Sequence, residues 1–134
     1  MTAVLIALLL SAPLEYVDGI FIAARILNVD PILAVGVAEW ESGFQPGLEC
    51  VNKDGSTDFG IMQLNSRHHH QYRESIDKHI MMGVAVLHGC LLMTGGDVER
   101  ALSLYNTGRA DGETGKRYAA HVMEIYTRIK EVAK

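Results

Sequence analysis

Cysteine and proline are scarce in this sequence, and no cluster of thiols is present. Only three residues are proline and two are cysteine, Cys50 and Cys90, with no CxxC pair, which argues against a thiolate zinc site. In an oxidising compartment the two cysteines could form one disulfide, closing a loop of about forty residues and stabilising the fold by roughly 3 to 4 kcal/mol. Two buried free thiols are the alternative, and the sequence leaves both open.

An excess of positive charge is also lacking. Twelve basic residues against sixteen acidic ones give a net charge of −4, so attraction to nucleic acid or to an anionic membrane cannot drive binding of the whole chain. The 49% hydrophobic and 21% charged composition excludes a disordered chain, which has few large apolar residues. With 134 residues the chain is expected to fold as one domain around one core.

A stable membrane span is not predicted. The first thirteen residues, MTAVLIALLLSAP, contain an apolar stretch from Ala3 to Leu10, which is too short to cross a bilayer. This stretch resembles the core of a signal peptide, although the usual basic residues before it are missing. A first helix of the mature fold is the alternative. We therefore divide the chain into this N-terminal segment, residues 1–13, and a domain over residues 14–134.

Helical periodicity dominates the rest of the chain. Apolar residues recur at three- and four-residue spacing, Asp30 followed by Pro31 is typical of a helix start, and NKDGST at 52–57 supports a short β-hairpin. The prediction is a mainly α domain of the α+β class, compact and helical, with a small β-hairpin or loop-rich lobe. The predicted helices span residues 14–27, 31–41, 76–93, 98–105 and 118–132, and the turn-rich segment spans residues 43–60.

Glu41 is the residue best suited to catalysis, because it stands at the end of an almost wholly apolar helix. Partial burial and the dipole at a helix C-terminus both disfavour a charged carboxylate, so they raise its pKa. A carboxyl that is protonated near neutral pH is what a general acid needs in order to protonate a departing sugar oxygen. Trp40, the only tryptophan, is expected in the core beside Glu41 rather than on the surface as a sugar platform.

Three ordered motifs carry a family resemblance. They read ESGFQP from Glu41, DFGIMQLN from Asp58 and ALSLYNTG from Ala101. In this order and spacing they resemble the lysozyme-like superfamily, in particular the soluble lytic transglycosylase (SLT) domain with its patterns ESxFxP, GxMQ and AxxYNxG. A late tyrosine, Tyr118, completes the resemblance, which runs from about Leu14 to the C-terminus.

The resemblance implies a lysozyme-like fold, with the small lobe flanking an active-site cleft. It also implies cleavage of the β-1,4 bond between N-acetylmuramic acid and N-acetylglucosamine in bacterial peptidoglycan. A lytic transglycosylase needs one acid/base, Glu41, because the C6 hydroxyl of muramic acid attacks within the substrate and yields a 1,6-anhydro product. The sequence favours this mechanism narrowly.

Two other readings stay open. A hydrolytic lysozyme (muramidase) needs a second carboxylate, and similarity to the hairpin of animal c-type lysozymes places Asp58 there. Likeness to goose-type lysozymes instead offers Asp54, but the aspartate that closes the GxMQ motif in those enzymes is replaced by Asn65 here. Outside the enzymes, the alternative is a non-catalytic peptidoglycan-binding or virion structural domain.

Further residues are implied to bind the substrate. Gln63 and Asn65 are expected to hydrogen-bond sugar amides. Ser42 is expected to orient a substrate carbonyl or the catalytic carboxyl, and Tyr118 is suited equally to substrate contact and to packing. Met62 is expected mainly in the core. With Glu41 and Asp58 as catalytic residues, the expected substrate-binding residues are Ser42, Gln63, Asn65, Tyr105, Asn106 and Tyr118.

No metal site and no cofactor are predicted. The histidines at 68–70 would point in different directions on a helix, so they make a poor set of ligands. The expected partners are glycan strands of peptidoglycan and not nucleic acid. We expect a monomer that acts in the periplasm or outside the cell, either secreted or carried by a phage.

Overall fold

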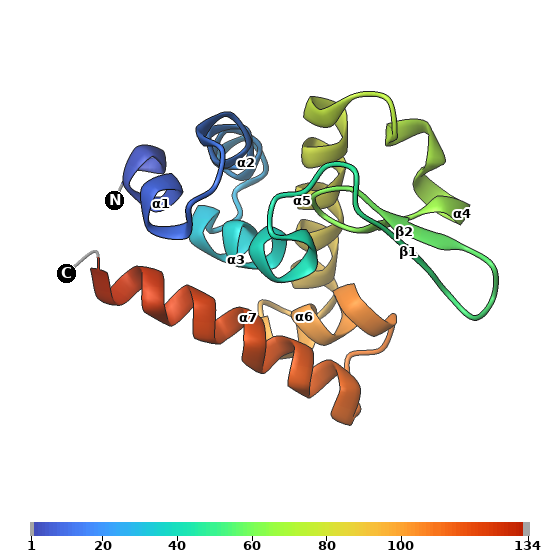
Figure 1. Cartoon of the computed structure of the whole chain (residues 1–134). Coiled ribbons are helices and arrows are strands. Elements are labelled where there is room, and N and C mark those ends of the chain that lie inside the picture. Colours follow the sequence, from blue (N-terminus) through green and yellow to red (C-terminus); the bar gives the residue numbers. More distant parts are fainter. Residues whose placement is uncertain (1, 133–134) are drawn as a thin grey trace.

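The computed structural model describes residues 2–132, which form a mainly helical domain with a small antiparallel sheet (Figure 1). This confirms the predicted fold class. The helices are α1 (Ala3–Leu10), α2 (Leu14–Leu27), α3 (Pro31–Ser42), α4 (Ser66–His69), α5 (Ile76–Met93), α6 (Val98–Thr107) and α7 (Glu113–Val132), with a 3-10 turn, η1, at His70–Tyr72. The strands are β1 (Glu49–Val51), β2 (Thr57–Phe59) and β3 (Leu64–Asn65).

The ends of α2 and α3 follow the capping residues that the sequence provides. α2 ends at Asn28, whose backbone is left-handed with φ 56°. The carboxylate of Asp30 accepts a hydrogen bond from the Ile32 amide at 2.9 Å, and Pro31 occupies the first position of α3. These are the residue types that such positions favour. As a result, Glu41 lies in the last turn of α3, as predicted.

The turn-rich segment and the residues after it fold into a three-stranded sheet in the order β1-β2-β3. β1 and β2 form the expected hairpin, with Cys50 opposite Asp58, and the turn between them uses Gly55 at φ 86°. β3 is a strand that the sequence analysis does not predict, because its two residues are too few to show an alternating pattern. Its pairing places Asn65 beside Asp58.

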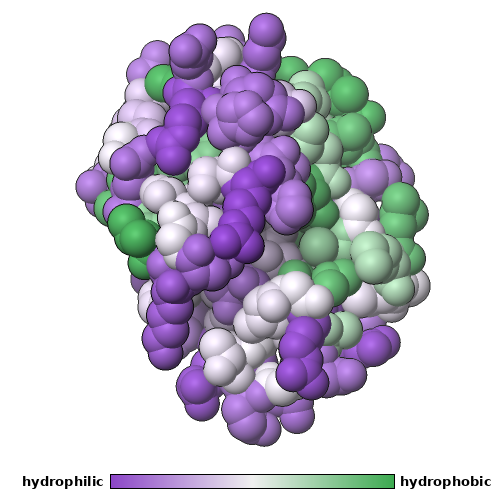
Figure 2. All heavy atoms as spheres, turned by 90° about the vertical axis from the view of Figure 1, so that its right-hand side faces the viewer, coloured by the Kyte–Doolittle hydropathy of each residue, from purple (hydrophilic) through white to green (hydrophobic). Residues whose placement is uncertain are grey.

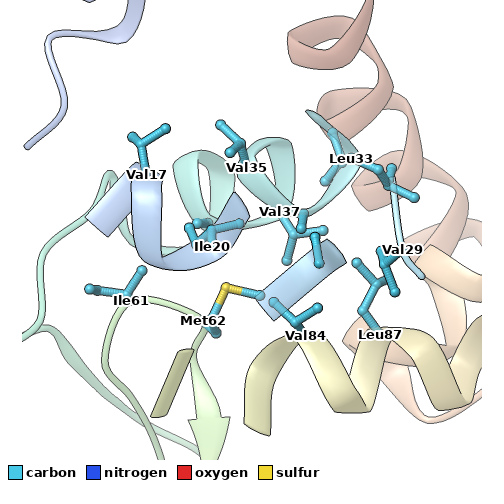
Figure 3. Packing of buried hydrophobic residues seen from close by; sticks show 14 of the residues in the cluster. Val17, Ile20, Val29, Leu33, Val35, Val37, Ile61, Met62, Val84 and Leu87 are labelled. Carbon is cyan, nitrogen blue, oxygen red and sulfur yellow. The ribbon is translucent and has the colours of Figure 1, made fainter. Parts of the chain in front are cut away.

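The hydrophobic core surrounds α3. This helix packs against α2 and α7, while α5 packs against α2 and α6. Residues 33–38 of α3 are all buried, which confirms that the helix is enclosed on nearly all sides. Figure 3 shows side chains of α2, α3 and α5 meeting those of Ile61 and Met62 in one cluster. Glu41 therefore stands on a rigid support.

α1 and α5 bear on the question of membrane association. α1 packs against α2, with Ile6 and Ala7 buried and Leu5 and Leu8 exposed. The division at residue 13, and the removal of the first segment as a signal, stay predictions. Among the described helices, only α5 is long and apolar enough by composition to cross a bilayer. It also contributes residues such as Val84 to the core, and its length and composition alone are weak evidence for a span.

α7 begins at Glu113, five residues before the predicted start at 118. The buried position of its first turns is Gly115, where a Cβ atom would lie 1.8 Å from the Ser103 hydroxyl oxygen on α6. A glycine in that position allows the two helices to approach closely, but it hides the apolar periodicity on which the prediction depends. The predicted start is therefore wrong for a non-local reason.

The two cysteines are both free in the structure. Cys50 is exposed on β1, an edge strand, and Cys90 is buried in α5. The disulfide is therefore not formed, and the alternative of two buried thiols is wrong for Cys50. Burial raises the pKa of the Cys90 thiol, which makes it unreactive near neutral pH.

Candidate active site

A pocket of about 360 Å³ lies between the sheet, α5 and α6, with the end of α3 at its edge. The face that carries the sheet and α4 is mostly hydrophilic, with an apolar strip along one side (Figure 2). A polar pocket of this size is better suited to binding a sugar than to binding an apolar ligand. The residues that line it are Glu41, Asn52, Asp54, Ser56, Asp58, Gln63, Leu64, Asn65, His69, Val86, Tyr105 and Asn106.

Six of the eight residues that the sequence analysis selects line this pocket, and two do not. The structure brings together Glu41, Asp58, Gln63, Asn65, Tyr105 and Asn106. Ser42 and Tyr118 are both buried, at 4% and 5% exposure, and lie behind the pocket wall. They contact the protein's own atoms, as described below.

Glu41 is the carboxyl of the pocket whose pKa is raised by its surroundings. Burial raises the pKa of its carboxyl to about 7, and the negative charge of Asp58 contributes in the same direction. A hydrogen bond from the Tyr118 hydroxyl to Oε2, at 2.9 Å, acts against these effects. Burial is the largest of the three causes, so Glu41 can both hold and release its proton near neutral pH.

Tyr118 holds Glu41 from behind. It lies on α7, and burial, with the charge of Glu41, raises the pKa of its phenol well above the usual value. The phenol therefore stays protonated and can only donate its proton in this hydrogen bond. A fixed donor of this kind orients the carboxyl and stabilises its ionised form. The two expectations for Tyr118 are substrate contact and packing; its buried position favours packing, and the sequence does not predict its bond to Glu41.

Ser42 fixes the end of α3 to the turn at residues 60–63, which joins β2 and β3. Its hydroxyl donates to the Ile61 carbonyl at 2.8 Å and accepts from the Phe44 amide at 3.1 Å. Phe44 has a left-handed backbone, with φ 65°, so this bond helps to hold a strained turn directly after the helix. These bonds fix the backbone directly after Glu41.

His79 supports the same turn and has no role in the sequence analysis. Its Nε2 atom accepts a hydrogen bond from the Met62 amide at 2.9 Å. Burial lowers the pKa of His79 to about 4, so the ring is neutral and able to accept. Gly60 has φ 80°, and a Cβ atom there would lie 2.5 Å from this ring. A larger residue at position 60 would therefore clash with His79. The only sequence signal is a polar residue on the buried face of an apolar helix.

Tyr105 joins α6 to the other side of the turn. Its hydroxyl donates to the Met62 carbonyl at 2.6 Å, and its ring lines the pocket. The Met62 side chain is fully buried, as expected, because Gly83 on α5 leaves room for it: a Cβ atom there would lie 2.4 Å from the methionine. The GxMQ segment is therefore hydrogen-bonded to side chains of three helices, α3, α5 and α6.

A network of polar side chains forms the sheet side of the pocket. The Asn65 amide donates to the Asp58 carboxylate and to the Ser56 hydroxyl, both at 3.0 Å. The Ser56 hydroxyl in turn donates to the Asp54 carboxylate at 2.5 Å, and Arg67 lies 3.3 Å from the other Asp54 oxygen. Bonds from Ser56, followed by the charge of Arg67, lower the pKa of Asp54. This carboxylate is therefore ionised at neutral pH.

The two amide side chains expected to bind sugars are already hydrogen-bonded within the protein. The amide nitrogen of Gln63 donates to the carbonyls of Leu48 and Gly60 at 3.1 and 2.8 Å. Gln63 itself has a left-handed backbone, with φ 51°. The Asn65 oxygen accepts from the Arg67 amide at 3.0 Å. Both side chains are thus rigid parts of the pocket wall, which suits orientation of a ligand.

Trp40 is exposed, which corrects the expectation that it lies in the core. The residue is 46% exposed, and its ring is stacked on that of His121 from α7, with centroids 4.1 Å apart and planes inclined by 11°. The buried position next to α7 is taken by Gly36, whose Cβ would lie 3.4 Å from Val122. Trp40 therefore lies over the surface of α7, and the burial of Glu41 comes from other groups.

The histidines at 68–70 occupy α4 and η1, where two of them are exposed and His69 lines the pocket. Within residues 2–132 no group of three or more histidine, cysteine or acidic side chains is arranged to hold a metal ion. The pocket itself is lined by three carboxyl groups, those of Glu41, Asp54 and Asp58. Of these three, Glu41 is the one whose pKa is raised, to about 7.

Comparison with known proteins gives consistent results. The family described as Transglycosylase SLT domain matches residues 18–126. Invasion protein IagB of Salmonella typhi is 29% identical over 142 aligned residues, covering 97% of this chain and 88% of that protein. Protein IpgF of Shigella flexneri is 31% identical over 121 residues, covering 80% of this chain and 78% of that protein.

A solved structure supports the fold. The chain is similar to an inactive mutant of the lytic transglycosylase Slt from Pseudomonas aeruginosa, with a TM-score of 0.65 and 17% identity. The match covers 81% of this chain but 23% of that protein, so the chain spans about a quarter of its length. At this identity the likeness concerns the fold, which is lysozyme-like as expected.

Proposed function

From the premise that the chain belongs to the transglycosylase SLT domain family, and is thus a peptidoglycan-cleaving glycosidase, we propose that it acts as a lytic transglycosylase. The substrate bond is the β-1,4 link between N-acetylmuramic acid and N-acetylglucosamine, and the product is a 1,6-anhydro sugar. Glu41 serves as the only acid/base. The observation that carries this proposal is the burial of Glu41 at the pocket edge, which raises its pKa to about 7.

A pKa near 7 allows one carboxyl to take both roles in turn. In the first step Glu41 gives its proton to the bridging oxygen as the bond between that oxygen and the muramic acid C1 breaks. In the second step the ionised Glu41 removes the proton of the C6 hydroxyl as its oxygen bonds to C1. No water is consumed, and Glu41 regains its proton. A pKa matched to the working pH is optimal for such shared acid and base duty.

Attack from within the substrate replaces the second carboxylate that hydrolysis requires. The C6 hydroxyl is held close to C1 by the sugar ring itself, which corresponds to a high effective concentration relative to water. The donor bond from Tyr118 to Glu41 stabilises the ionised carboxyl between the two steps. We assign Tyr118 and Ser42 to positioning Glu41, the first directly and the second through the turn.

The remaining pocket residues are proposed to hold the glycan. Gln63 and Asn65 would orient the sugar amides, while Tyr105 and Asn106 form the opposite wall. The rigid turn at residues 60–63 keeps these groups at a fixed distance from Glu41. A substrate held in this way places its scissile bond at the carboxyl, which supplies much of the rate enhancement.

Hydrolysis is the second candidate because Asp58 lines the same pocket and its charge raises the pKa of Glu41. Asp58 could then hold a water or act as a nucleophile. However, its Oδ1 atom accepts a hydrogen bond from Asn65, which suits a structural or substrate-binding carboxylate as well. We therefore place it in the glycan-binding wall.

Mass spectrometry of the muropeptides released from purified peptidoglycan tests the proposal. Transglycosylation gives 1,6-anhydro products, which are lighter than hydrolytic products by one water. We expect anhydro products from the wild type and from Asp58→Asn, which keeps the Asn65 contact possible. The lysozyme mechanism would be established instead if the wild type released products that are heavier by one water and Asp58→Asn were inactive.

The substrate also determines where the protein works. Peptidoglycan lies outside the cytoplasmic membrane, so we propose that the chain acts in the periplasm or outside the cell, with residues 1–13 as the segment that directs export. We also propose that the protein is a monomer. Size-exclusion chromatography and N-terminal sequencing of the exported protein test these two points.

A further inference from the structure

We propose that Trp40 and His121 form an aromatic platform that binds sugar residues of the glycan strand beyond the pocket, on the α7 side of Glu41. The proposal rests on the proposed function, because it concerns the same strand. The ligand would be a pyranose ring that presents its apolar C–H face to the indole. We call the two side chains the Trp40–His121 platform.

Two pairs of side chains connect α3 with α7, and one of them includes Glu41, which lines the pocket. Glu41 and Tyr118 form the first, with a 2.9 Å hydrogen bond. Trp40 and His121 form the second, with ring centroids 4.1 Å apart. Trp40 directly precedes Glu41, and His121 lies three residues after Tyr118, which is one turn of helix away. The platform is therefore adjacent to the catalytic pair.

The indole is exposed and yet supported. Trp40 is 46% exposed, while the nearly parallel His121 ring covers part of it. Single exposed apolar residues are common and need no explanation. A stacked indole, however, is already held in one orientation, so little side-chain entropy is lost when a ligand covers it. Its amphipathic ring suits a ligand that is apolar on one face and polar at its edges.

A glycan strand must continue on both sides of the bond that is cut. The pocket walls come from α3 to α6 and the sheet, and none of the residues that line the pocket belongs to α7. We place the sugars on one side of Glu41 in this pocket and, as part of the proposal, those on the other side along a different surface. α7 contacts Glu41 through Tyr118, and the platform is the exposed aromatic pair next to that contact.

Intrinsic fluorescence tests the platform directly, because Trp40 is the only tryptophan in the chain. We would titrate Glu41→Gln, which should bind without cleaving, with soluble glycan strands stripped of their peptides. The expected result is a saturable change in the emission of Trp40, with no change on addition of an α-1,4-glucan of equal length. Binding detected by calorimetry without any change in emission would overturn the proposal.

Steady-state kinetics on the same strands provide the second test. Trp40→Ala should raise KM by roughly threefold to tenfold while kcat changes by less than about twofold, as expected for loss of one aromatic contact. Trp40→Phe should restore most of the affinity. Ile26→Ala, which truncates a 66% exposed side chain on α2, is the matched control and should resemble the wild type. A wild-type KM for Trp40→Ala would refute the platform.

The two tests separate this proposal from the proposed function. If the wild type gives anhydro products and Trp40 emission is unaffected by glycan, the platform is wrong and the transglycosylase stands. If emission changes but no anhydro product forms, the reaction is wrong and the platform stands. Should Trp40→Ala fail to fold, His121→Ala removes only the supporting ring and retains the fluorescent reporter. It should weaken glycan binding, and unchanged affinity would count against the platform.

Discussion

The helical wall and the sheet wall of the pocket carry the same chemical group, a carboxyl, in opposite environments. On the helical wall Glu41 is partly buried, and burial outweighs its hydrogen bond from Tyr118, so its pKa rises to about 7. On the sheet wall Asp54 is exposed, and its bonds from Ser56 with the charge of Arg67 lower its pKa. Solvation and hydrogen bonding, rather than residue type, thus decide which carboxyl can act as an acid at neutral pH.

The largest expected effect comes from removing the acid on the helical wall. Glu41→Gln keeps the shape of the side chain and an oxygen that can accept from Tyr118, but it cannot donate or take a proton during the reaction. Turnover of purified peptidoglycan should fall by about 10² to 10⁴-fold, the usual contribution of a general acid. Release of soluble muropeptides measures this effect.

Glu39→Gln is the matched control, because Glu39 lies on the same helix two residues earlier and does not line the pocket. Its activity should stay within about twofold of the wild type, as for most surface substitutions. Retained turnover in Glu41→Gln would remove Glu41 from the mechanism.

The second effect concerns stability. Between pH 4.5 and about 7 the folded protein keeps the Glu41 proton while the unfolded chain has lost it, so this group makes stability fall as pH rises, by up to about 3 kcal/mol. His79 acts in the opposite direction: its pKa falls from 6.5 to about 4 on folding, so its contribution is lost as pH falls through this range. The two effects overlap in the wild type.

The variant Glu41→Gln separates the contribution of Glu41 to stability from that of His79, because glutamine does not ionise. The variant should be more stable than the wild type at pH 8, and the difference should vanish below pH 4.5. Urea unfolding at several pH values measures this difference. If the free energies of unfolding of the two proteins changed in parallel with pH, Glu41 would have an ordinary pKa.

A smaller effect is expected from Tyr118→Phe. The Tyr118 hydroxyl lowers the pKa of Glu41, so its removal should raise that pKa further. The alkaline fall in kcat should move to higher pH by up to about one unit, the value of a hydrogen bond to a charged group. The pH profile distinguishes this role from simple packing, since a purely structural residue would lower activity without moving the profile.

The smallest effect is expected on the sheet wall. The side chain of Asp54 is about half exposed, at 52%, and a charge that faces water is strongly screened. Asp54→Asn should therefore leave the alkaline fall in kcat within about 0.2 pH units of the wild type. A loss of activity comparable to that of Glu41→Gln would identify Asp54 as a second catalytic carboxylate, as in the goose-type likeness.

Local signals explain what the sequence predicts correctly. The Asp30-Pro31 start and the apolar run of α3 depend on neighbouring residues, and they already place Glu41 at the end of a buried helix. The fold class follows from the same periodicity. The motifs around Glu41, Asp58 and Tyr105 bring the pocket residues together because the SLT domain family shares this arrangement.

Non-local contacts explain what the sequence does not predict. The start of α7 depends on the contact between Gly115 and Ser103, and the exposure of Trp40 depends on how α3 crosses α7. The bond from Met62 to His79 joins residues 17 positions apart. No periodicity or spacing within one element carries this information, so these features appear only once the helices are packed.

The protonation of Glu41 is the central claim, and NMR tests it most directly. The side-chain carboxyl carbons of ¹³C-labelled glutamate would be followed from pH 3 to pH 9, with Glu41→Gln used to assign the signal that disappears. We predict that this signal titrates with a midpoint near 7, as burial requires. A midpoint near 4.5, the ordinary value for glutamate, would contradict the account.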